Sequence, residues 1–358
     1  MNFCYHTDLW EYLQATDKTV VLYGMGNGAD KILAVCERYG IPVADVFASD
    51  GFVRGHSFHG KTVLSYSEVK EKYGADNLIV LLSFGSALPD VLALFDRVER
   101  ECELYAPDVP VCGDTLFTRS FFEEHREEFE RVFHLLADEE SRRIYENVLR
   151  YKLTGRIGYL RDAESSKDEV YRTLLQADSI ISAADLGAYN GDTVRELMGY
   201  APNLKTVVAM EPDRRNFRKL SEFAEAMTAP SVRAVHAAAW SEETALRFAA
   251  SGNRNAGAFA VGKTVEIDAL PLDAVLGGAH VDYIKYDVEG AEREALIGSR
   301  ETICRYRPRL LVSVYHRSED LFALPLQLHA TDPSYRLYLR RYPYVPAWDL
   351  NLIGISST

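Results

Sequence analysis

One short segment in the C-terminal half places three charged side chains on a strand that should be buried. Residues 283–289 have the sequence YIKYDVE, in which charged and apolar residues alternate. Because successive side chains on a strand point to opposite faces, Lys285, Asp287 and Glu289 share one face. Charges on a buried strand are costly unless they pair with one another or face a cleft. We therefore predict that this face lines a site; the alternative is a purely structural cluster of charges.

These side chains, together with His316, suit a reaction in which a hydroxyl group loses its proton. His316 follows the apolar segment 309–315, which we expect to be the neighbouring strand. In open α/β sheets the cleft lies at the carboxyl ends of such strands, where a carboxylate or an imidazole can act as general base. Asp287 is the first candidate base and His316 the second, and Lys285 could orient a carboxylate or a substrate oxygen. A divalent metal held by Asp287, Glu289 and His316 is an alternative, but the spacing matches no recognised metal motif, so we predict a site without a metal.

A glycine-containing turn earlier in the chain has the layout of a small-ligand site. An expected strand leads into Asp185-x-Gly187-x-x-x-Gly191, and Glu211 ends the next expected strand. Glycines let a ligand approach the backbone, the N-terminus of the following helix offers free N–H groups, and an acid at the end of the next strand can bind ribose hydroxyls. The turn does not match the dinucleotide motif G-x-G-x-x-G, because position 189 is Tyr rather than Gly. It is also one residue wider than that motif. An ordinary turn with a surface acid is the alternative interpretation.

Both segments belong to a series of alternating strands and helices over residues 179–358, which is typical of a parallel α/β sheet. We expect its parallel strands at 180–185, 206–211, 233–239, 281–287 and 309–315. The alternating segments 335–341 and 349–355 are joined by a proline-rich turn and predict a terminal hairpin, so one strand should run antiparallel to the rest. The polar segment 251–257 predicts a long loop, and loops of this kind often cover a ligand.

A smaller series at the start of the chain predicts another doubly wound domain, over residues 1–112. Its first expected strand leads into Gly24-Met-Gly-Asn-Gly-Ala29, which fits the dinucleotide variant G-x-G-x-x-A, and Asp50 could bind a ribose. A short motif of this kind is weak evidence by itself. Charge-rich helices over 113–178 should connect the two domains, and a proline-containing segment marks the boundary. We expect few contacts across it.

Composition restricts the classes of function. The chain has 358 residues, of which 47% are hydrophobic, and its net charge is −13. These values fit a soluble globular protein of about two domains, and the negative charge argues against a nucleic-acid or anionic-membrane partner. The longest aliphatic run, residues 78–82, is far shorter than the ~20 residues of a membrane-spanning helix. Five scattered cysteines and an N-terminus without a secretion signal predict free thiols in the cytoplasm.

The glycine turn, the acid after the second strand and the antiparallel terminal strand together resemble class I S-adenosyl-L-methionine (SAM)-dependent methyltransferases. The segments 283–298 (YIKYDVEGAEREALIG) and 135–149 (LLADEESRRIYENVL) resemble the signature of FkbM methyltransferases, and the resemblance covers about residues 130–355. It implies an α/β fold: a Rossmann-like class I methyltransferase sheet with an antiparallel terminal strand. Ahead of it we expect the helical connector and the smaller Rossmann-like domain, whose layout resembles nucleotide-sugar-binding domains.

The resemblance also implies roles for individual residues. Residues implied in SAM binding are Asp185, Gly187, Tyr189, Gly191, Thr193, Glu211, Asp213, Ala239 and Trp240. Glu211 would bind the ribose, and the segment 238–240 would lie beside the adenine. The family is associated with O-methylation of sugar or natural-product hydroxyls, which implies a small-molecule acceptor and leaves a homodimer open.

Two other functions remain as alternatives. An NAD(P)- or nucleotide-sugar-dependent enzyme would be centred on the N-terminal glycine turn and would need a catalytic pair, such as Tyr66-x-x-x-Lys70. A non-catalytic binding protein with a methyltransferase fold is the second alternative. The retained acids argue against it, because a decayed site should have lost some of them; they are Asp185, Glu211, Asp287 and Glu289.

Overall fold

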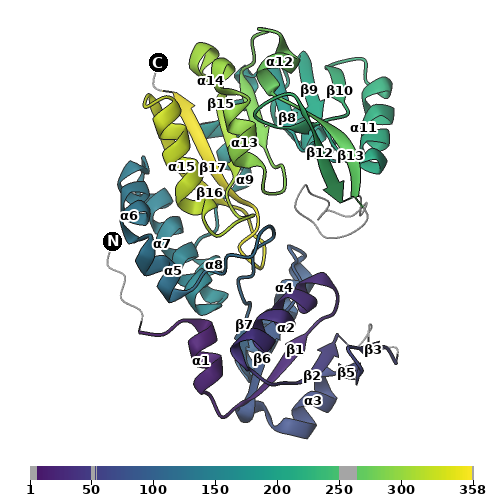
Figure 1. Cartoon of the computed structure of the whole chain (residues 1–358), viewed down its shortest axis with the longest axis vertical. Helices are drawn as coiled ribbons and strands as arrows, with labels where there is room; N and C mark the ends of the chain where they lie inside the picture. Colours follow the sequence, from purple (N-terminus) through teal and green to yellow (C-terminus); the bar gives the residue numbers. More distant parts are fainter. Residues whose placement is uncertain (1–5, 50–52, 54, 250–263, 357–358) are drawn as a thin grey trace.

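The computed structural model describes residues 6–49, 53, 55–249 and 264–356. Two central sheets lie at opposite ends of the molecule, and a group of helices from the middle of the chain lies beside them (Figure 1). Both Asp50 and the expected ligand-covering loop at 251–257 fall outside the described residues.

The N-terminal sheet has five parallel strands in the order β5-β2-β1-β6-β7. Its strands are β1 (Thr19–Tyr23), β2 (Val43–Ala48), β5 (Leu64–Ser65), β6 (Leu78–Leu82) and β7 (Glu103–Tyr105), and a short ribbon is formed by β3 (Ser57–Phe58) and β4 (Lys61–Thr62). The helices are α1 (Leu9–Ala15), α2 (Asn27–Tyr39), α3 (Tyr66–Tyr73) and α4 (Pro89–Glu101). Local signals set their ends: Ser65 and Glu68 form a capping box at the start of α3, and Gly40 ends α2 in the left-handed conformation.

The connecting helices are amphipathic. They are α5 (Arg119–Glu124), α6 (Arg126–Leu135), α7 (Glu139–Thr154), α8 (Gly158–Arg161) and α9 (Lys167–Glu169). Phe122, Phe129 and Val132 form one apolar stripe and are buried in the main core. Asp138 caps the start of α7, and Gly155 ends it in the left-handed conformation.

The C-terminal sheet has seven strands in the order β10-β9-β8-β14-β15-β17-β16. The strands are β8 (Ser182–Leu186), β9 (Thr206–Met210), β10 (Ser231–Val235), β14 (Tyr283–Tyr286), β15 (Arg309–Ser313), β16 (Tyr335–Arg341) and β17 (Leu350–Ser356). The helices that follow them are α10 (Asp192–Tyr200), α11 (Arg214–Ala226), α12 (Leu272–Leu276), α13 (Glu292–Ile297), α14 (Arg300–Tyr306) and α15 (Asp320–Thr331). Because β17 runs antiparallel to both β15 and β16, the predicted terminal hairpin is confirmed.

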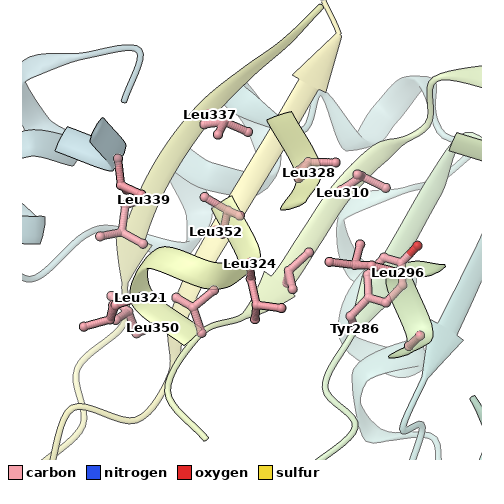
Figure 2. Packing of buried hydrophobic residues seen from close by; sticks show 14 of the residues in the cluster. Tyr286, Leu296, Leu310, Leu321, Leu324, Leu328, Leu337, Leu339, Leu350 and Leu352 are labelled. Carbon is pink, nitrogen blue, oxygen red and sulfur yellow. The ribbon is translucent and has the colours of Figure 1, made fainter. Parts of the chain in front are cut away.

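Leucines of α15 cover the half of this sheet that holds the terminal hairpin. Leu321, Leu324 and Leu328 pack with leucines of β15, β16 and β17 in one buried cluster (Figure 2). Burying each such side chain stabilises the fold by about 1.5–3 kcal/mol. The cluster fixes the antiparallel hairpin against the parallel strands that carry the predicted site.

The region between 236 and 282 differs from the prediction. The single strand expected at 233–239 is interrupted, because the Ala237 N–H bonds the Val235 carbonyl and turns the chain after β10. β11 (Ala238–Ala239) then leaves the main sheet and joins a small one with β12 (Thr244–Ala249) and β13 (Thr264–Leu270), in the order β11-β13-β12. We did not predict this small sheet.

The contacts across the expected domain boundary are more extensive than predicted. Tyr151 and Leu160 of the connecting helices, and Val345 of the β16–β17 loop, belong to one buried cluster with the N-terminal sheet. Lys152 forms a buried ion pair of 2.8 Å with Asp108. The loop of the yellow hairpin reaches the N-terminal sheet (Figure 1), where Val345 and Ser86 exchange two backbone hydrogen bonds of 2.9 and 3.0 Å. The expectation of few contacts is therefore wrong.

Removal of the N-terminal sheet should destabilise the rest of the chain. A protein of residues 116–358 would expose apolar side chains such as Tyr151, Leu160 and Val345, each worth about 1.5–3 kcal/mol, against a total stability of about 5–15 kcal/mol. We expect the fragment to be insoluble or to unfold at a lower temperature than the full chain in calorimetry. Co-expression with residues 1–112 should restore solubility; a soluble fragment with an unchanged melting temperature would contradict the shared core.

Within the described part of the chain, every helix is too short or too polar to cross a lipid bilayer.

Candidate active site

The carboxyl ends of β8, β9, β14 and β15 surround a cavity of about 270 Å³. Its position agrees with the rule that ligands of open α/β sheets bind beyond the carboxyl ends of the strands. The predicted site residues that line it are Gly187, Tyr189, Thr193, Glu211, Ala239, Trp240, Lys285, Asp287 and Glu289. The structure therefore brings together two segments that the sequence analysis derived separately.

The glycine turn after β8 is shaped by a close approach to β14. Gly187 has a φ of 85°, and a Cβ there would lie 1.9 Å from the carbonyl oxygen of Asp287. A larger residue would push the ends of the two strands apart. Gly191, with a φ of 84°, begins α10 without a side-chain cap, which leaves N–H groups of the first turn for a ligand.

Glu211 lies directly after β9 and faces the turn. Its carboxylate accepts hydrogen bonds of 2.9 Å from the backbone N–H groups of Tyr189 and Asp213. Burial raises the pKa of Glu211 to about 7. A carboxylate has about four acceptor sites, so two bonds leave capacity for ligand hydroxyls.

Asp213 has a different position from the other predicted SAM-binding residues. Its side chain accepts hydrogen bonds from the N–H groups of Arg215 and Asn216 and so caps α11. It does not line the cavity, and neither do Asp185, Gly191 or His316.

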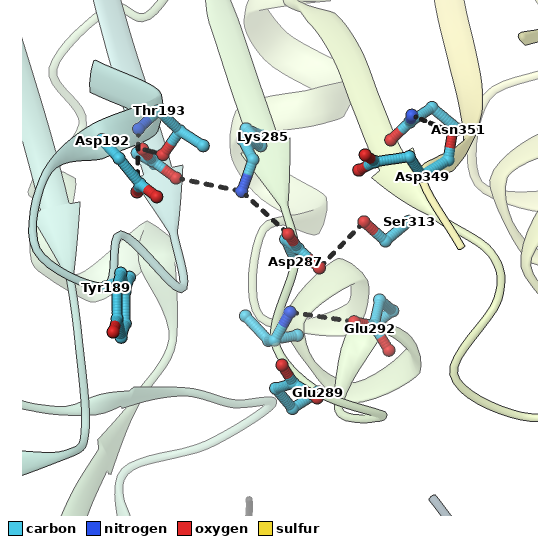
Figure 3. A network of polar contacts seen from close by, with 12 residues as sticks. Tyr189, Asp192, Thr193, Lys285, Asp287, Glu289, Glu292, Ser313, Asp349 and Asn351 are labelled. Carbon is cyan, nitrogen blue, oxygen red and sulfur yellow. Dashed lines mark hydrogen bonds and ion pairs between the residues drawn. The ribbon is translucent and has the colours of Figure 1, made fainter. Parts of the chain in front are cut away.

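A line of charges connects the two halves of the cavity (Figure 3). The Lys285 Nζ lies 3.6 Å from Asp185 Oδ1 and 3.3 Å from Asp287 Oδ2, and Thr193 donates its hydroxyl hydrogen to Asp185. Burial favours a lower pKa for Lys285, but the charges of Asp287 and Asp185 outweigh it and raise the pKa. Lys285 thus remains a cation and holds the two carboxylates in place.

Asp287 lies one residue beyond the end of β14, where the predicted strand already turns. Its Oδ1 accepts hydrogen bonds from the hydroxyls of Ser313 at 3.0 Å and Tyr315 at 3.2 Å. Burial favours a higher pKa for Asp287, but Lys285 and His316 outweigh it and lower the pKa. Glu289 lies in the turn with a φ of 51° and not on the strand, yet its side chain still reaches the cavity.

His316 is completely buried beside three carboxylates. Its Nδ1 lies 2.9 Å from Glu292 Oε1, and its Nε2 lies 3.6 Å from Asp287 Oδ1 and 3.7 Å from Glu289 Oε2. Burial favours a lower pKa for His316, but Glu292 and the other carboxylates raise it to about 10. With a pKa this high, His316 already carries its proton at neutral pH. It is therefore poorly suited to act as the general base.

Several functional positions were not found from the sequence. The additional lining residues are Val111, Asp192, Pro212, Asn216, Leu246, Val288, Ala291, Tyr315, Tyr344, Trp348 and Asp349. Glu292 is the missed residue that the sequence came nearest to indicating. It is buried in the first turn of the short helix α13, three residues after Glu289, and an acid placed there faces the ends of the strands. Tyr344 and Trp348 form a stacked pair with ring centroids 5.5 Å apart, and nothing in their local sequence indicates the cavity.

The N-terminal candidates are explained by packing. A Cβ on Gly24 would lie 2.5 Å from the ring of Phe84, and one on Gly28 would lie 2.2 Å from a backbone carbonyl, so these glycines allow close contact with the end of β6. Tyr66 and Lys70 both donate hydrogen bonds to Glu101 on α4. They are therefore engaged away from the glycine turn.

Comparison with known proteins agrees with this geometry. Residues 185–346 match the family model described as the methyltransferase FkbM domain. The crystal structure of methyltransferase FkbM from Methylobacillus flagellatus KT shares the fold, with a TM-score of 0.72 and 23% identity over 94% of this chain and 90% of that chain.

More distant likenesses have low scores. The precorrin-6y C5,15-methyltransferase from Geobacter metallireducens GS-15 has a TM-score of 0.34 and 12% identity, over 55% of this chain and 94% of that one. An rRNA methylase from Streptococcus thermophilus has a TM-score of 0.35 and 12% identity, over 57% of this chain and 98% of that one. No curated protein matches the sequence significantly. Residues 185–346 therefore match the methyltransferase FkbM domain over a little under half of the chain, and the whole chain shares the fold of a methyltransferase FkbM structure.

Proposed function

We propose that the protein transfers a methyl group from SAM to a hydroxyl of a sugar-like or natural-product acceptor. One observation supports this most: a single cavity holds both the ribose-type acid Glu211 beside a glycine turn and the carboxylates Asp287 and Glu289. The first group suits an adenosyl ligand, and the second suits a hydroxyl that must lose its proton.

The residues present fit SAM. Asp185 Oδ1 is buried without a hydrogen-bond partner, 3.6 Å from the Lys285 ammonium, and α10 begins at Gly191 without a side-chain cap, although Asp192 accepts the Thr193 N–H. In our proposal Glu211 accepts hydrogen bonds from the ribose hydroxyls, and Trp240 and Ala239 border the adenine. Bound SAM supplies an electrophilic methyl group on a sulfonium.

The remaining walls suit a polyhydroxylated acceptor. Tyr315, Tyr344 and Trp348 offer aromatic surface, and Asp349 offers a carboxylate that can accept hydrogen bonds from hydroxyls. In the proposed reaction Asp287 takes the hydroxyl proton as the acceptor oxygen bonds the methyl carbon. The carbon–sulfur bond breaks with its electron pair on sulfur, which yields the methyl ether and S-adenosylhomocysteine. The chain aligns the two reactants and excludes water.

A thermal-shift experiment tests the cofactor. A ligand at ~100 times its dissociation constant stabilises the folded state by about 2.7 kcal/mol. We expect SAM and S-adenosylhomocysteine to raise the melting temperature, whereas NAD and nucleotide sugars should not. Stabilisation by NAD with none by SAM would contradict the proposal and favour the N-terminal glycine turn as the active centre. Binding of SAM without turnover on any hydroxylated acceptor would favour the non-catalytic alternative.

A further inference from the structure

Three carboxylates have an oxygen within 3.7 Å of a ring nitrogen of His316, more than the single charge of the ring can balance. They belong to Asp287, Glu289 and Glu292, and of these Asp287 also pairs with Lys285. Figure 3 shows the side chains of Asp287, Glu289 and Glu292 around one turn at the end of β14. Buried charges of one sign are costly unless a cation compensates them.

The two ring nitrogens of His316 have different surroundings. Nδ1 faces Glu292, whose side chain is 1% exposed and whose Oε1 also accepts the Val288 N–H at 2.9 Å. Nε2 faces Asp287 and Glu289, the two carboxylates that line the cavity. Both nitrogens are fully buried without a hydrogen bond of good geometry, but Nδ1 has Glu292 at 2.9 Å, whereas the carboxylates that face Nε2 lie 3.6 and 3.7 Å away.

This arrangement has the form of a metal-binding histidine with an orienting acid. Histidine ligands typically direct one ring nitrogen at a carboxylate, which fixes the ring and leaves the other nitrogen for the metal. Glu292 at 2.9 Å from Nδ1 occupies the orienting position. The nitrogen left over is the one that points at the cavity carboxylates.

We propose that Asp287, Glu289 and His316 bind a divalent cation of the Mg²⁺ or Mn²⁺ type at the acceptor end of the cavity. The inference rests on the proposed function and extends it. Glu292 does not bind the ion: it is a positioning residue that holds the His316 ring.

The donor set and its spacing fit such an ion. Two carboxylate oxygens and one imidazole nitrogen are hard to intermediate ligands, which suit Mn²⁺ and, with more water, Mg²⁺. Bonds of about 2.1 Å in an octahedral site place neighbouring ligand atoms about 3 Å apart. The two carboxylate oxygens lie 3.6 and 3.7 Å from His316 Nε2, so both carboxylates, and the Glu289 side chain above all, must move toward a shared ion. Three ligands from one side leave further coordination positions open toward the cavity.

A cation here would act on the acceptor oxygen. An oxygen bound to the ion has a lowered pKa and a fixed position. Asp287 then contributes as a ligand through Oδ1, which gives up a hydrogen bond from Ser313 or Tyr315 to do so. The hydroxyl proton still passes to Asp287, at Oδ2, as in the proposed reaction, since a polarised hydroxyl needs only a weak base.

A protonated His316, with a hydrogen on Nε2, would compensate the same carboxylates without a metal. The experiment must therefore distinguish a bound metal ion from a protonated imidazole. We would treat the full chain with a chelator, remove the chelator, and titrate Mn²⁺ while recording the electron paramagnetic resonance signal of the free ion. We expect one saturable site per chain, from which Mg²⁺ in excess displaces Mn²⁺. No saturable binding would overturn the proposal.

Variants locate the site. His316→Gln and Glu289→Gln should each weaken Mn²⁺ binding at least tenfold, and Glu292→Gln should weaken it about 10- to 100-fold although Glu292 does not touch the ion. The matched control is Asp192→Asn, which removes a carboxylate that lines the same cavity at the start of α10. It should leave the Mn²⁺ affinity unchanged. Equal weakening by Asp192→Asn and Glu289→Gln would show diffuse attraction by acidic groups, and it would overturn the assignment of ligands.

Parallel measurement of SAM binding distinguishes this proposal from the proposed function. The Mn²⁺-site variants should keep their SAM-induced thermal shift, which also confirms that they fold. If the unmodified chain responds to SAM but not to Mn²⁺, the metal site is wrong and the methyl-transfer proposal stands. If it binds Mn²⁺ at these residues but never SAM, the proposed function fails. If His316→Gln does not fold, Glu289→Gln at the cavity surface decides the outcome alone.

Discussion

Replacing Asp287 by Asn should slow methyl transfer by about 10²–10⁴-fold while SAM affinity stays nearly unchanged. The substitution keeps size and polarity but removes the group that we propose to take the acceptor proton, and loss of a general base typically has this effect. Lys285 lies between Asp287 and Asp185, 3.3 Å from the first and 3.6 Å from the second. The substitution therefore leaves the charges of Lys285 and Asp185, beside the proposed SAM site, in place. The measurement is single-turnover formation of S-adenosylhomocysteine with a hydroxylated acceptor that the unmodified protein methylates.

Ser313→Ala is the matched control for this prediction. It removes one hydrogen bond of 3.0 Å to Asp287 Oδ1 and leaves the carboxylate, so we expect a loss of tenfold or less. Unchanged turnover in Asp287→Asn together with complete loss in His316→Ala would reverse the assignment of the base. The Mn²⁺ affinity of Asp287→Asn shows whether the lost turnover reflects a lost proton acceptor or a lost metal ligand. Unfolding of Asp287→Asn would indicate that the charges serve structure.

Replacing Glu211 by Ala should weaken SAM binding about ten- to a hundredfold. A charge-assisted hydrogen bond contributes about 1.5–3 kcal/mol, and Glu211 should accept such bonds from the ribose. The change also releases the backbone N–H groups of Tyr189 and Asp213, which loosens the turn around the ligand. Calorimetric titration with SAM measures the effect before any acceptor is known.

Glu222→Ala on the exposed side of α11 is the matched control and should bind SAM normally, because that side chain is 69% exposed. The unmodified protein should also show a pH dependence that Glu211→Ala lacks. Burial and the neighbouring Asp213 raise the pKa of Glu211, whereas its hydrogen bonds from Asp213, Tyr189 and Asn216 oppose them, and the result is about 7. The carboxylate is therefore protonated below pH 7, so SAM affinity should fall as the pH drops through that value. Equal affinity of both proteins across this range would remove Glu211 from the ribose site.

Several features of the fold could be predicted because their signals are local. Glycine, proline and capping residues mark where helices start and stop, as at Gly40 and Gly155. Alternation of side chains predicted a hairpin of residues 335–341 and 349–355, and the structure has its strands at Tyr335–Arg341 and Leu350–Ser356. Because the carboxyl ends of parallel strands meet at one edge of a sheet, the order of strands and turns was sufficient to expect Gly187 and Asp287 at a common site.

The expectation of few contacts across the domain boundary failed for a different reason. A proline-containing segment indicates where the backbone changes direction, but it does not indicate which surfaces on either side of it pack together in the folded chain. Tyr151 and Val345 are far apart in sequence and share a core with the N-terminal sheet. Likewise the interruption of the strand at Ala237 depends on one backbone hydrogen bond that no residue type requires.

The sequence by itself determined the methyltransferase family resemblance, the two α/β series and most of the cavity residues in and near the glycine turn, because these depend on residue types at short spacing. Only the tertiary structure decided which other residues complete the cavity. Tyr344, Trp348 and Asp349 reach the cavity because the hairpin folds back as an antiparallel pair, and Glu292 meets His316 because α13 begins beside β15. These contacts join segments that are far apart in the sequence. Packing of the whole core, rather than any local pattern, brings them together.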